Sequence, residues 1–339
     1  MIKMRRIFLL ALAPLLLWAC KGDITGLFPE AGGKMGELVL VVNEEDLKSE
    51  WVDTLQEYFT RPMPVLPQDE PYWKLYTISP GSFQNLYRVH RNVLIISINP
   101  KQTEAAYAVE KDGYATGQLV VTLAAKDKAS VLAYFKEVRE EIETMFRKKD
   151  MEKLVREYDK ILNREAQNKM KEVTGLRLSV PDGFYGVRDT TDFVYYSHEA
   201  TRQAKTDRES YPAKIQRGIW VASGPYLSAD VFKPSVALHI RDSITALYIP
   251  SSKAGSYMMT EPRVPADTAI VNFNGQRALI QHGLWRMKDE FKGGPYVNIL
   301  TYNPQKVRWV MIDGFVYAPQ FDKRDYMLQV ESIVRMARP

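Results

Sequence analysis

The chain of 339 residues contains a single cysteine, Cys20, and this limits how the protein can be stabilised. No disulfide bond can form within the chain, so the folded part depends on hydrophobic cores alone. Small secreted domains usually need disulfides, but a chain of this length can bury cores of adequate size without them. We therefore expect ordinary globular domains.

The position of Cys20 indicates a membrane anchor. Three basic residues open the chain, and an apolar run over 7–19 leads directly to the cysteine. A membrane-spanning helix needs about 20 apolar residues, and this shorter run fits the core of a signal peptide. The arrangement resembles the lipoprotein signal of bacteria. The resemblance implies that residues 1–19 are removed, that Cys20 receives acyl chains such as palmitate, and that the protein is anchored in the outer membrane, with the face left open.

The net charge of the chain says little about its binding partners. The formal charge of +5 falls to +2 once the three basic residues of the signal leave. Nucleic-acid binding needs a clustered basic patch, whereas the charges here are mixed along the chain. We expect no nucleic-acid partner. The expected partners are the membrane, through the lipid on Cys20, and another envelope protein.

The rest of the chain divides into two predicted domains joined by a helix. Residues 20–36 are rich in glycine and are expected to form a flexible tether. Residues 37–147 are expected to form an N-terminal α+β domain, and residues 176–339 a C-terminal α+β domain. The segment 148–175 is expected to be a helical connector.

The N-terminal half shows strand and helix signals in alternation. An almost continuous apolar run over 37–42 is typical of a strand buried on both faces. Asn43 is placed to cap a helix that begins at Glu44. Further strands are predicted at 73–78, 92–98 and 118–124.

The longest helical pattern in the chain runs from Asp127 to Gly175. A polar stretch over 148–150 divides it, so the sequence allows one long helix or two helices with a break near Lys149. Gly175 is typical of a helix C-terminus. This pattern is expected to join the two domains.

Strand signals dominate the second half. An alternating segment from Leu176 into the turn 181–183 predicts a strand. One helix is predicted over 228–247 and another from Asp322 onwards. Further strands are predicted at 192–197, 218–223, 278–281, 295–302, 308–313 and 315–318.

These patterns predict the α+β class, with two sheet-plus-helix domains joined by a long central helical segment. Asp127 and Asp322 each follow a strand and begin an amphipathic helix with apolar residues at matching offsets. Any amphipathic helix gives such a match, but it also allows a duplicated α/β sandwich. The second half resembles the small α/β sandwich of the photosystem-associated PsbP proteins and of the nuclear-transport factor Mog. That resemblance implies a fold and no function.

No catalytic, metal-binding or cofactor motif stands out. The four histidines lack the spacing of metal ligands. No nucleophile elbow, phosphate-binding loop or dinucleotide fingerprint occurs, and acylation uses the only thiol. We therefore expect a protein that is not an enzyme and that has no metal or cofactor.

Two alternatives stay open. Four aromatic residues lie beside polar ones: Tyr72, Trp73, Tyr185 and Trp220. This combination suits a partner surface or the face of a sugar ring. Aromatic residues also fill half-buried sheets, which would explain these positions without a site. In the first alternative, these four would be the binding residues of a glycan- or small-ligand-binding lipoprotein.

The second alternative is a hydrolase that uses the carboxylates of Asp182, Asp189 or Glu199. Such a site needs two carboxyls about 5–10 Å apart, one with a raised pKa. Aspartate also favours turns, which explains these positions without any site.

The signal, the strand at 37–42, the central helix and the segment 309–320 (WVMIDGFVYAPQ) together resemble an uncharacterised family of Bacteroidota lipoproteins, a domain of unknown function. The resemblance implies an envelope lipoprotein and brings no catalytic residues. The leading hypothesis is therefore a non-catalytic lipoprotein of the outer membrane that acts through protein–protein contacts.

Overall fold

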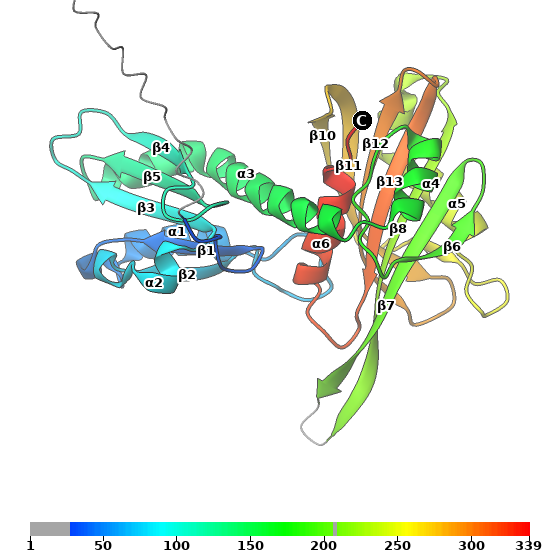
Figure 1. Cartoon of the computed structure of the whole chain (residues 1–339), viewed down its shortest axis with the longest axis horizontal. Coiled ribbons are helices and arrows are strands. Elements are labelled where there is room, and N and C mark those ends of the chain that lie inside the picture. Colours follow the sequence, from blue (N-terminus) through cyan, green and yellow to red (C-terminus); the bar gives the residue numbers. More distant parts are fainter. Residues whose placement is uncertain (1–27, 206–208) are drawn as a thin grey trace, which may run out of the picture.

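The computed structural model describes residues 28–205 and 209–339 and consists of two domains linked by one long helix (Figure 1). The expected architecture of two sheet-plus-helix domains is confirmed. The signal peptide expected at 1–19 and the lipidation site Cys20 lie outside the described residues. In the described part, no helix is both long and apolar enough to span a bilayer.

The N-terminal domain is built on a five-stranded sheet in the order β2-β1-β3-β5-β4. Four of its strands are parallel and β4 is antiparallel to β5. The central strand β1 is buried on both faces, as its apolar run predicts. β4 is largely exposed and has no apolar run, so no strand was predicted there. The strands are β1 (Glu37–Val41), β2 (Lys74–Ile78), β3 (Asn92–Ile98), β4 (Ala106–Lys111) and β5 (Leu119–Ala125).

Helices α1 (Glu50–Thr60) and α3 (Lys128–Lys160) cover one face of this sheet and form its main core with it. The other face carries a smaller cluster around Val39 and Val93, beside the short helices η3 (Pro80–Ser82) and α2 (Asn85–Arg88). The helix expected from Glu44 is a single 3-10 turn, η2 (Glu44–Asp46), and Asn43 makes no side-chain cap. α1 begins only after Ser49, and Asp46 of the 3-10 turn is buried.

Helix α3 belongs to both domains. It is continuous through Lys149, so the break considered there does not occur, and the chain first bends at residues 161–163. Asp127 caps its start by accepting a hydrogen bond of 2.7 Å from the backbone N–H of Ser130. Its first half packs on the N-terminal sheet, and its last turns reach the C-terminal domain, where α4 (Arg164–Thr174) follows.

The C-terminal domain contains an eight-stranded sheet that is antiparallel throughout, in the order β10-β11-β12-β13-β8-β7-β6, with β9 beside β11. The segments predicted at 308–313 and 315–318 form one strand. The strand predicted from Leu176 is not formed, and this stretch makes only isolated bridges. The strands are β6 (Tyr185–Asp189), β7 (Phe193–Lys205), β8 (Ser210–Pro225), β9 (Met258–Thr260), β10 (Asp267–Phe273), β11 (Gln276–Met287), β12 (Gly293–Asn303) and β13 (Arg308–Tyr317).

Helices cover both faces of this second sheet. α4 and α6 (Arg324–Arg335) pack on one face, and α5 (Pro234–Tyr248) with η4 (Ala229–Phe232) packs on the other. Since one sheet is mostly parallel and the other wholly antiparallel, the two domains are not copies of one unit. The duplication considered from the sequence is therefore wrong.

The end of the expected tether is not free. Gly32 donates a backbone hydrogen bond of 2.8 Å to Val89 and accepts one of 3.0 Å from Arg91. Ala31 is buried and donates a hydrogen bond to Thr116. Residues 30–32 thus lie against the amino ends of β3 and β5, and the tether assignment does not hold for them.

Candidate functional site

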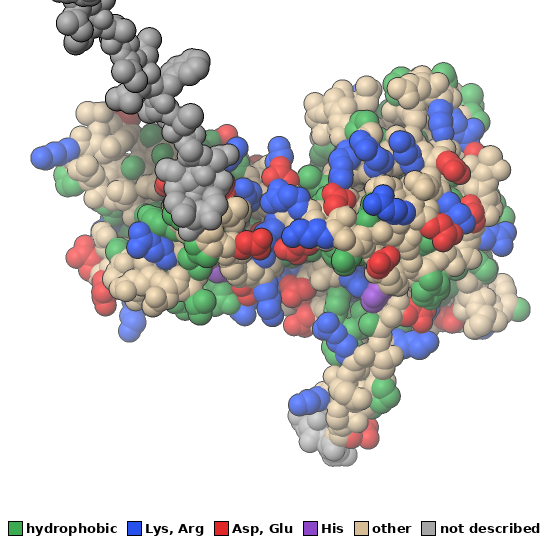
Figure 2. Space-filling model, in the orientation of Figure 1, with side chains coloured by type: hydrophobic (Ala, Val, Ile, Leu, Met, Phe, Trp, Pro, Cys, Tyr) green, Lys and Arg blue, Asp and Glu red, His purple; other side chains and the backbone are tan. Residues whose placement is uncertain are grey.

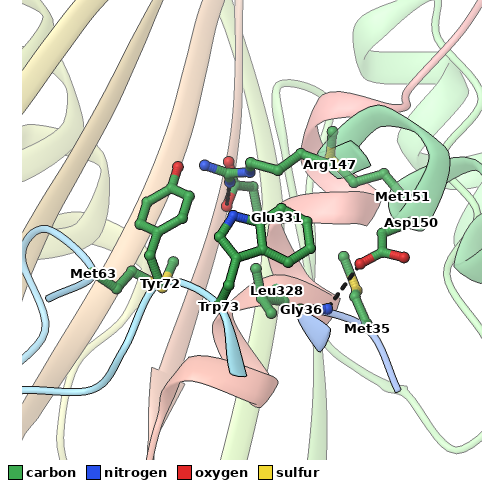
Figure 3. Close-up of a pocket in the computed structure, with 10 residues that line it drawn as sticks. All are labelled: Met35, Gly36, Met63, Tyr72, Trp73, Arg147, Asp150, Met151, Leu328 and Glu331. Carbon is green, nitrogen blue, oxygen red and sulfur yellow. Dashed lines mark hydrogen bonds and ion pairs between the residues drawn. The ribbon is translucent and has the colours of Figure 1, made fainter. Parts of the chain in front are cut away.

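The two domains meet where α3 passes α6, and buried charged side chains are concentrated there (Figure 3). A small cavity of about 10 Å³ lies at this junction. Figure 2 shows acidic and basic side chains mixed across the middle of the molecule. The cavity is lined by Met35, Gly36, Met63, Tyr72, Trp73, Arg147, Asp150, Met151, Leu328 and Glu331.

Glu143 of α3 gathers three groups of the N-terminal domain. Its carboxylate accepts hydrogen bonds from the indole N–H of Trp73 at 2.8 Å and from the Tyr58 hydroxyl at 3.1 Å. Arg61 completes the set with an ion pair of 2.6 Å. All of these groups are donors to one buried carboxylate, which fixes α3 against the loop that follows α1.

Glu331 of α6 forms the corresponding centre in the C-terminal domain. It pairs with Arg147 of α3 at 2.8 Å, with Arg335 at 3.1 Å and with His282 at 3.3 Å. Burial by itself raises the pKa of Glu331, but the nearby cationic groups outweigh it, so the pKa lies well below the ordinary value. Glu331 is therefore ionised, and its pair with Arg147 joins the two domains.

Tyr72 lies between the two arginines of these clusters. The Arg61 guanidinium is 4.3 Å from the centre of the Tyr72 ring, and that of Arg147 is 4.9 Å from it. Both distances suit cation–π attraction. The tyrosine thus keeps the two positive groups apart and links the Glu143 cluster to the Glu331 cluster.

Asp150, one helical turn after Arg147, holds the start of β1. It accepts a hydrogen bond of 2.8 Å from the backbone N–H of Gly36 and one of 3.0 Å from the Asn92 side chain. Burial raises the pKa of Asp150 to about 6, although Arg91 at 3.5 Å favours the charged form.

The enclosed cavity at the junction is too small for a substrate. This cavity is at most the size of a single water molecule, and the carboxylates of the junction are already paired with arginines or bound to N–H groups. Among the described residues, no three histidine, aspartate or glutamate side chains come together in a way that could hold a metal ion. The arrangement fastens the two domains to each other.

The four aromatic residues expected to bind a ligand do not form one site. Trp73 is 1% exposed in the core of the N-terminal domain, and Trp220 is wholly buried beneath α5. Tyr72 lies at the domain junction. Only Tyr185, on the edge strand β6, is exposed. The tryptophans fill cores because their large apolar surface is best buried, so they cannot stack on a glycan.

The carboxylates of the hydrolase alternative are also separate. Asp182, Asp189 and Glu199 are all exposed. Asp189 pairs with Lys169 at 2.7 Å, and Glu199 lies 3.7 Å from Lys214. A carboxylate pair of this kind needs at least one buried member, and the structure leaves all three exposed on separate segments.

A buried polar row was missed by sequence analysis. Four residues lie opposite one another on four neighbouring strands and are fully buried beneath α5: Gln281, Asn298, Asp313 and Trp220. Arg241 of α5 pairs with Asp313 at 2.8 Å and lies 3.6 Å from the Tyr296 ring. Burial raises the pKa of Asp313 to about 6, against the opposing effect of Arg241. Strand periodicity alone could have placed these residues on one face.

The most protruding feature is the arm, formed by residues 198–205 of β7 and 210–215 of β8 (Figure 1). β6 pairs with β7 only up to Ser197, and β13 pairs with β8 only from Gln216 onwards. Within the described residues, the arm therefore has no neighbouring strand on either side. The backbone groups that face outward along its two edges therefore have no strand partner.

These features define a two-domain α+β protein whose domains are joined by buried ion pairs and whose second sheet extends into a free hairpin. Residues 163–336 match the family described as domain of unknown function DUF4837, and the chain belongs to that family. Residues 31–159 match another domain of unknown function, DUF8532. No curated protein matches the sequence.

Proposed function

We propose that this protein is an outer-membrane lipoprotein of a bacterium of the Bacteroidota that is not an enzyme and acts by binding another envelope protein through the arm. The anchor part of the proposal rests on the sequence, in which an apolar run leads to Cys20. Several acyl chains on one cysteine give durable membrane attachment, since each buried CH₂ contributes about 0.8 kcal/mol.

The free edges of the arm carry the protein-binding part of the proposal. An isolated two-stranded ribbon is marginally stable in water, and an unpaired edge is a template for another strand. The arm leaves both edges open over residues 198–205 and 210–215. A partner that adds a strand of its own to one edge would satisfy these backbone groups.

The junction supports this proposal in a second way. Because Arg147 and Glu331 join the domains through a buried pair, the arm is held at a fixed position relative to the N-terminal domain. The tethered N-terminal end enters that domain at residues 30–32. The protein would then act as a spacer that presents the arm at a set distance from the membrane.

A photo-crosslinking amino acid at Thr201, in cells that make the lipidated protein, tests the arm directly. We expect one discrete adduct of higher mass with Thr201, and none with the same amino acid at Gln320, which is exposed but lies away from the arm. A second sample carries the crosslinker at Gln203, and there Thr201→Pro, which disrupts the regular strand β7, should abolish the adduct. An adduct that survives Thr201→Pro, or no adduct at all, would contradict the proposal.

The anchor is tested separately. Radiolabelled palmitate should enter the wild-type protein and not Cys20→Ser, and the variant should leave the membrane fraction. If Cys20→Ser stays in the membrane and still carries label, the lipoprotein assignment is wrong, whatever the arm binds.

A further inference from the structure

A pocket of about 180 Å³ lies in the C-terminal domain, at the opposite end of β13 from Gln320. The end of α4, the β10–β11 turn and the β12–β13 turn meet around it. On the same scale as the junction cavity, a single water needs about 10–15 Å³, so this pocket has room for a small ligand such as one sugar ring. The lining residues are Thr174, Gly175, Leu176, Phe273, Asn274, Gln276, Thr301, Tyr302, Asn303, Pro304, Gln305, Val310 and Pro339.

The floor of this pocket is apolar and its rim is polar. Phe273 and Val310 are buried and belong to the core beneath α4. Gln276 and Gln305 are exposed on the rim. Within the described part of the chain, neither side-chain amide has a hydrogen-bond partner. Each amide presents both a donor and an acceptor to the pocket mouth.

The walls are held in place before any ligand binds. The Asn303 side chain donates a hydrogen bond of 2.9 Å to the Thr174 carbonyl and accepts bonds from the backbone N–H groups of Gln305 at 3.0 Å and Lys306 at 3.1 Å. Asn274 donates one of 2.8 Å to the Ala337 carbonyl. Preformed walls reduce the entropy lost on binding.

Gly175 is required for this geometry. Its φ of +78° places it in the left-handed region, where glycine ends helices without strain. A Cβ at this position would lie 2.6 Å from Nδ2 of Asn303, the side chain that holds the β12–β13 turn against α4. Only glycine lets this turn approach the helix closely enough to close the pocket.

The charge of the pocket selects the class of ligand. Every lining side chain is neutral. The end of α4 that faces the pocket is its C-terminus, which carries a partial negative charge. Lys306 hydrogen-bonds the Glu172 carbonyl at this helix end. The neutral lining, which offers an anion no side-chain cation, is therefore what favours hydroxyl and amide groups over phosphate, sulfate and carboxylate groups.

We propose that this pocket binds a single neutral sugar ring, with the apolar face of the ring over the partly exposed Leu176 and its hydroxyls on Gln276 and Gln305. The site is separate from the arm and goes beyond the protein-binding role proposed above. It also differs from the aromatic set expected from the sequence, whose tryptophans are buried.

Saturation-transfer NMR and titration calorimetry on the full-length protein in mild detergent test the site. The probes are glucose and N-acetylglucosamine, with glucuronate and glucose 6-phosphate as charged counterparts. We expect both neutral sugars to bind, and the charged ones to bind at least about tenfold more weakly, since the pocket offers no cation to an anion.

Gln276→Ala and Gln305→Ala are surface changes that leave the fold intact, and each should weaken binding by about three- to tenfold through loss of a hydrogen bond. Gln320→Ala removes an equally exposed amide elsewhere and should change nothing. The proposal is overturned if neither neutral sugar binds at millimolar concentration, if the charged sugars bind equally well, or if both variants bind like the wild type.

Discussion

Glu70 of the N-terminal domain caps a helix of the C-terminal domain at Arg324. One carboxylate oxygen of Glu70 accepts a hydrogen bond of 2.8 Å from the backbone N–H of Arg324, and the other accepts one of 2.6 Å from that of Lys323. Helix N-termini carry unpaired N–H groups and a partial positive charge. The Glu70 carboxylate accepts hydrogen bonds from two of these N–H groups, and its negative charge complements the partial positive charge. The start of α6 therefore depends on a residue about 250 positions earlier in the chain.

Replacing this cap should destabilise the protein measurably. We expect Glu70→Ala to lower the free energy of unfolding by about 1–2 kcal/mol, the usual effect of losing a helix cap. Asp69→Ala, an exposed acidic neighbour, serves as the control and should change it by less than about 0.5 kcal/mol. Urea unfolding followed by circular dichroism measures both. Equal effects of the two variants would mean that Glu70 does not act as a cap.

The two arginines on Glu331 should differ in importance. Arg147 is largely buried, whereas Arg335 is more exposed, with side chains 17% and 31% accessible. We expect Arg147→Met to cost about 3 kcal/mol, because it removes the main partner of a buried carboxylate. Arg335→Met should cost less than about 1 kcal/mol. If thermal unfolding ranks the variants the other way, Arg147 does not join the domains as inferred.

The buried pair of Arg241 and Asp313 should show strong non-additivity. Arg241→Met leaves Asp313 buried without its partner and should cost about 3–5 kcal/mol. Combining it with Asp313→Leu removes the uncompensated charge, and we expect the double variant to recover at least about 2 kcal/mol. Denaturant unfolding of the two single variants and the double variant checks this. Additive losses would show that the two side chains do not interact energetically.

Asp150 should give a distinct pH dependence. Its pKa in the folded protein is about 6, above the ordinary value of 3.8, so between these values the folded state holds more protons than the unfolded state. The contribution of Asp150 to stability is therefore present below about pH 4 and is lost as the pH rises to about 6. Above that range the ionised group favours unfolding.

Asp150→Asn isolates this effect. The amide does not ionise, so we expect the stability of Asp150→Asn relative to wild type to improve by about 1–3 kcal/mol between pH 4 and pH 6.5. Asp159→Asn, whose carboxylate is partly exposed, provides a matched control on the same helix. A difference between Asp150→Asn and wild type that stays constant with pH would refute the assignment.

Local patterns in the sequence predicted most of the elements. The parallel strand β1, the helix α3 and the antiparallel series at the end of the chain follow from apolar periodicity, and these elements occur close to the expected residues. The strand β4 was missed because it is largely exposed, so burial left no apolar alternation to recognise in its sequence.

The candidate sites were not predictable in the same way. The junction brings Glu70 and Arg147 to residues of α6, and the sugar pocket brings Thr174 to Asn303. A single sequence does not show which carboxylate will meet an arginine nearly 200 positions away. The predicted ligand-binding role of Trp73 and Trp220 failed for the same reason. Both residues fit a strand pattern equally well whether the strand lies inside a core or on a surface.

The sequence by itself determined the number of domains, the class of each, the long connecting helix and the expectation of a lipid anchor at Cys20. These features are set by the periodicity and composition of short segments. Such segments form helices and strands through local hydrogen bonds and through burial of their apolar side. Only the tertiary structure decided which tryptophans are buried, which carboxylates are paired, and where the free arm and the neutral pocket lie. Burial and pairing depend on contacts between distant segments, and the packing of the whole chain sets those contacts.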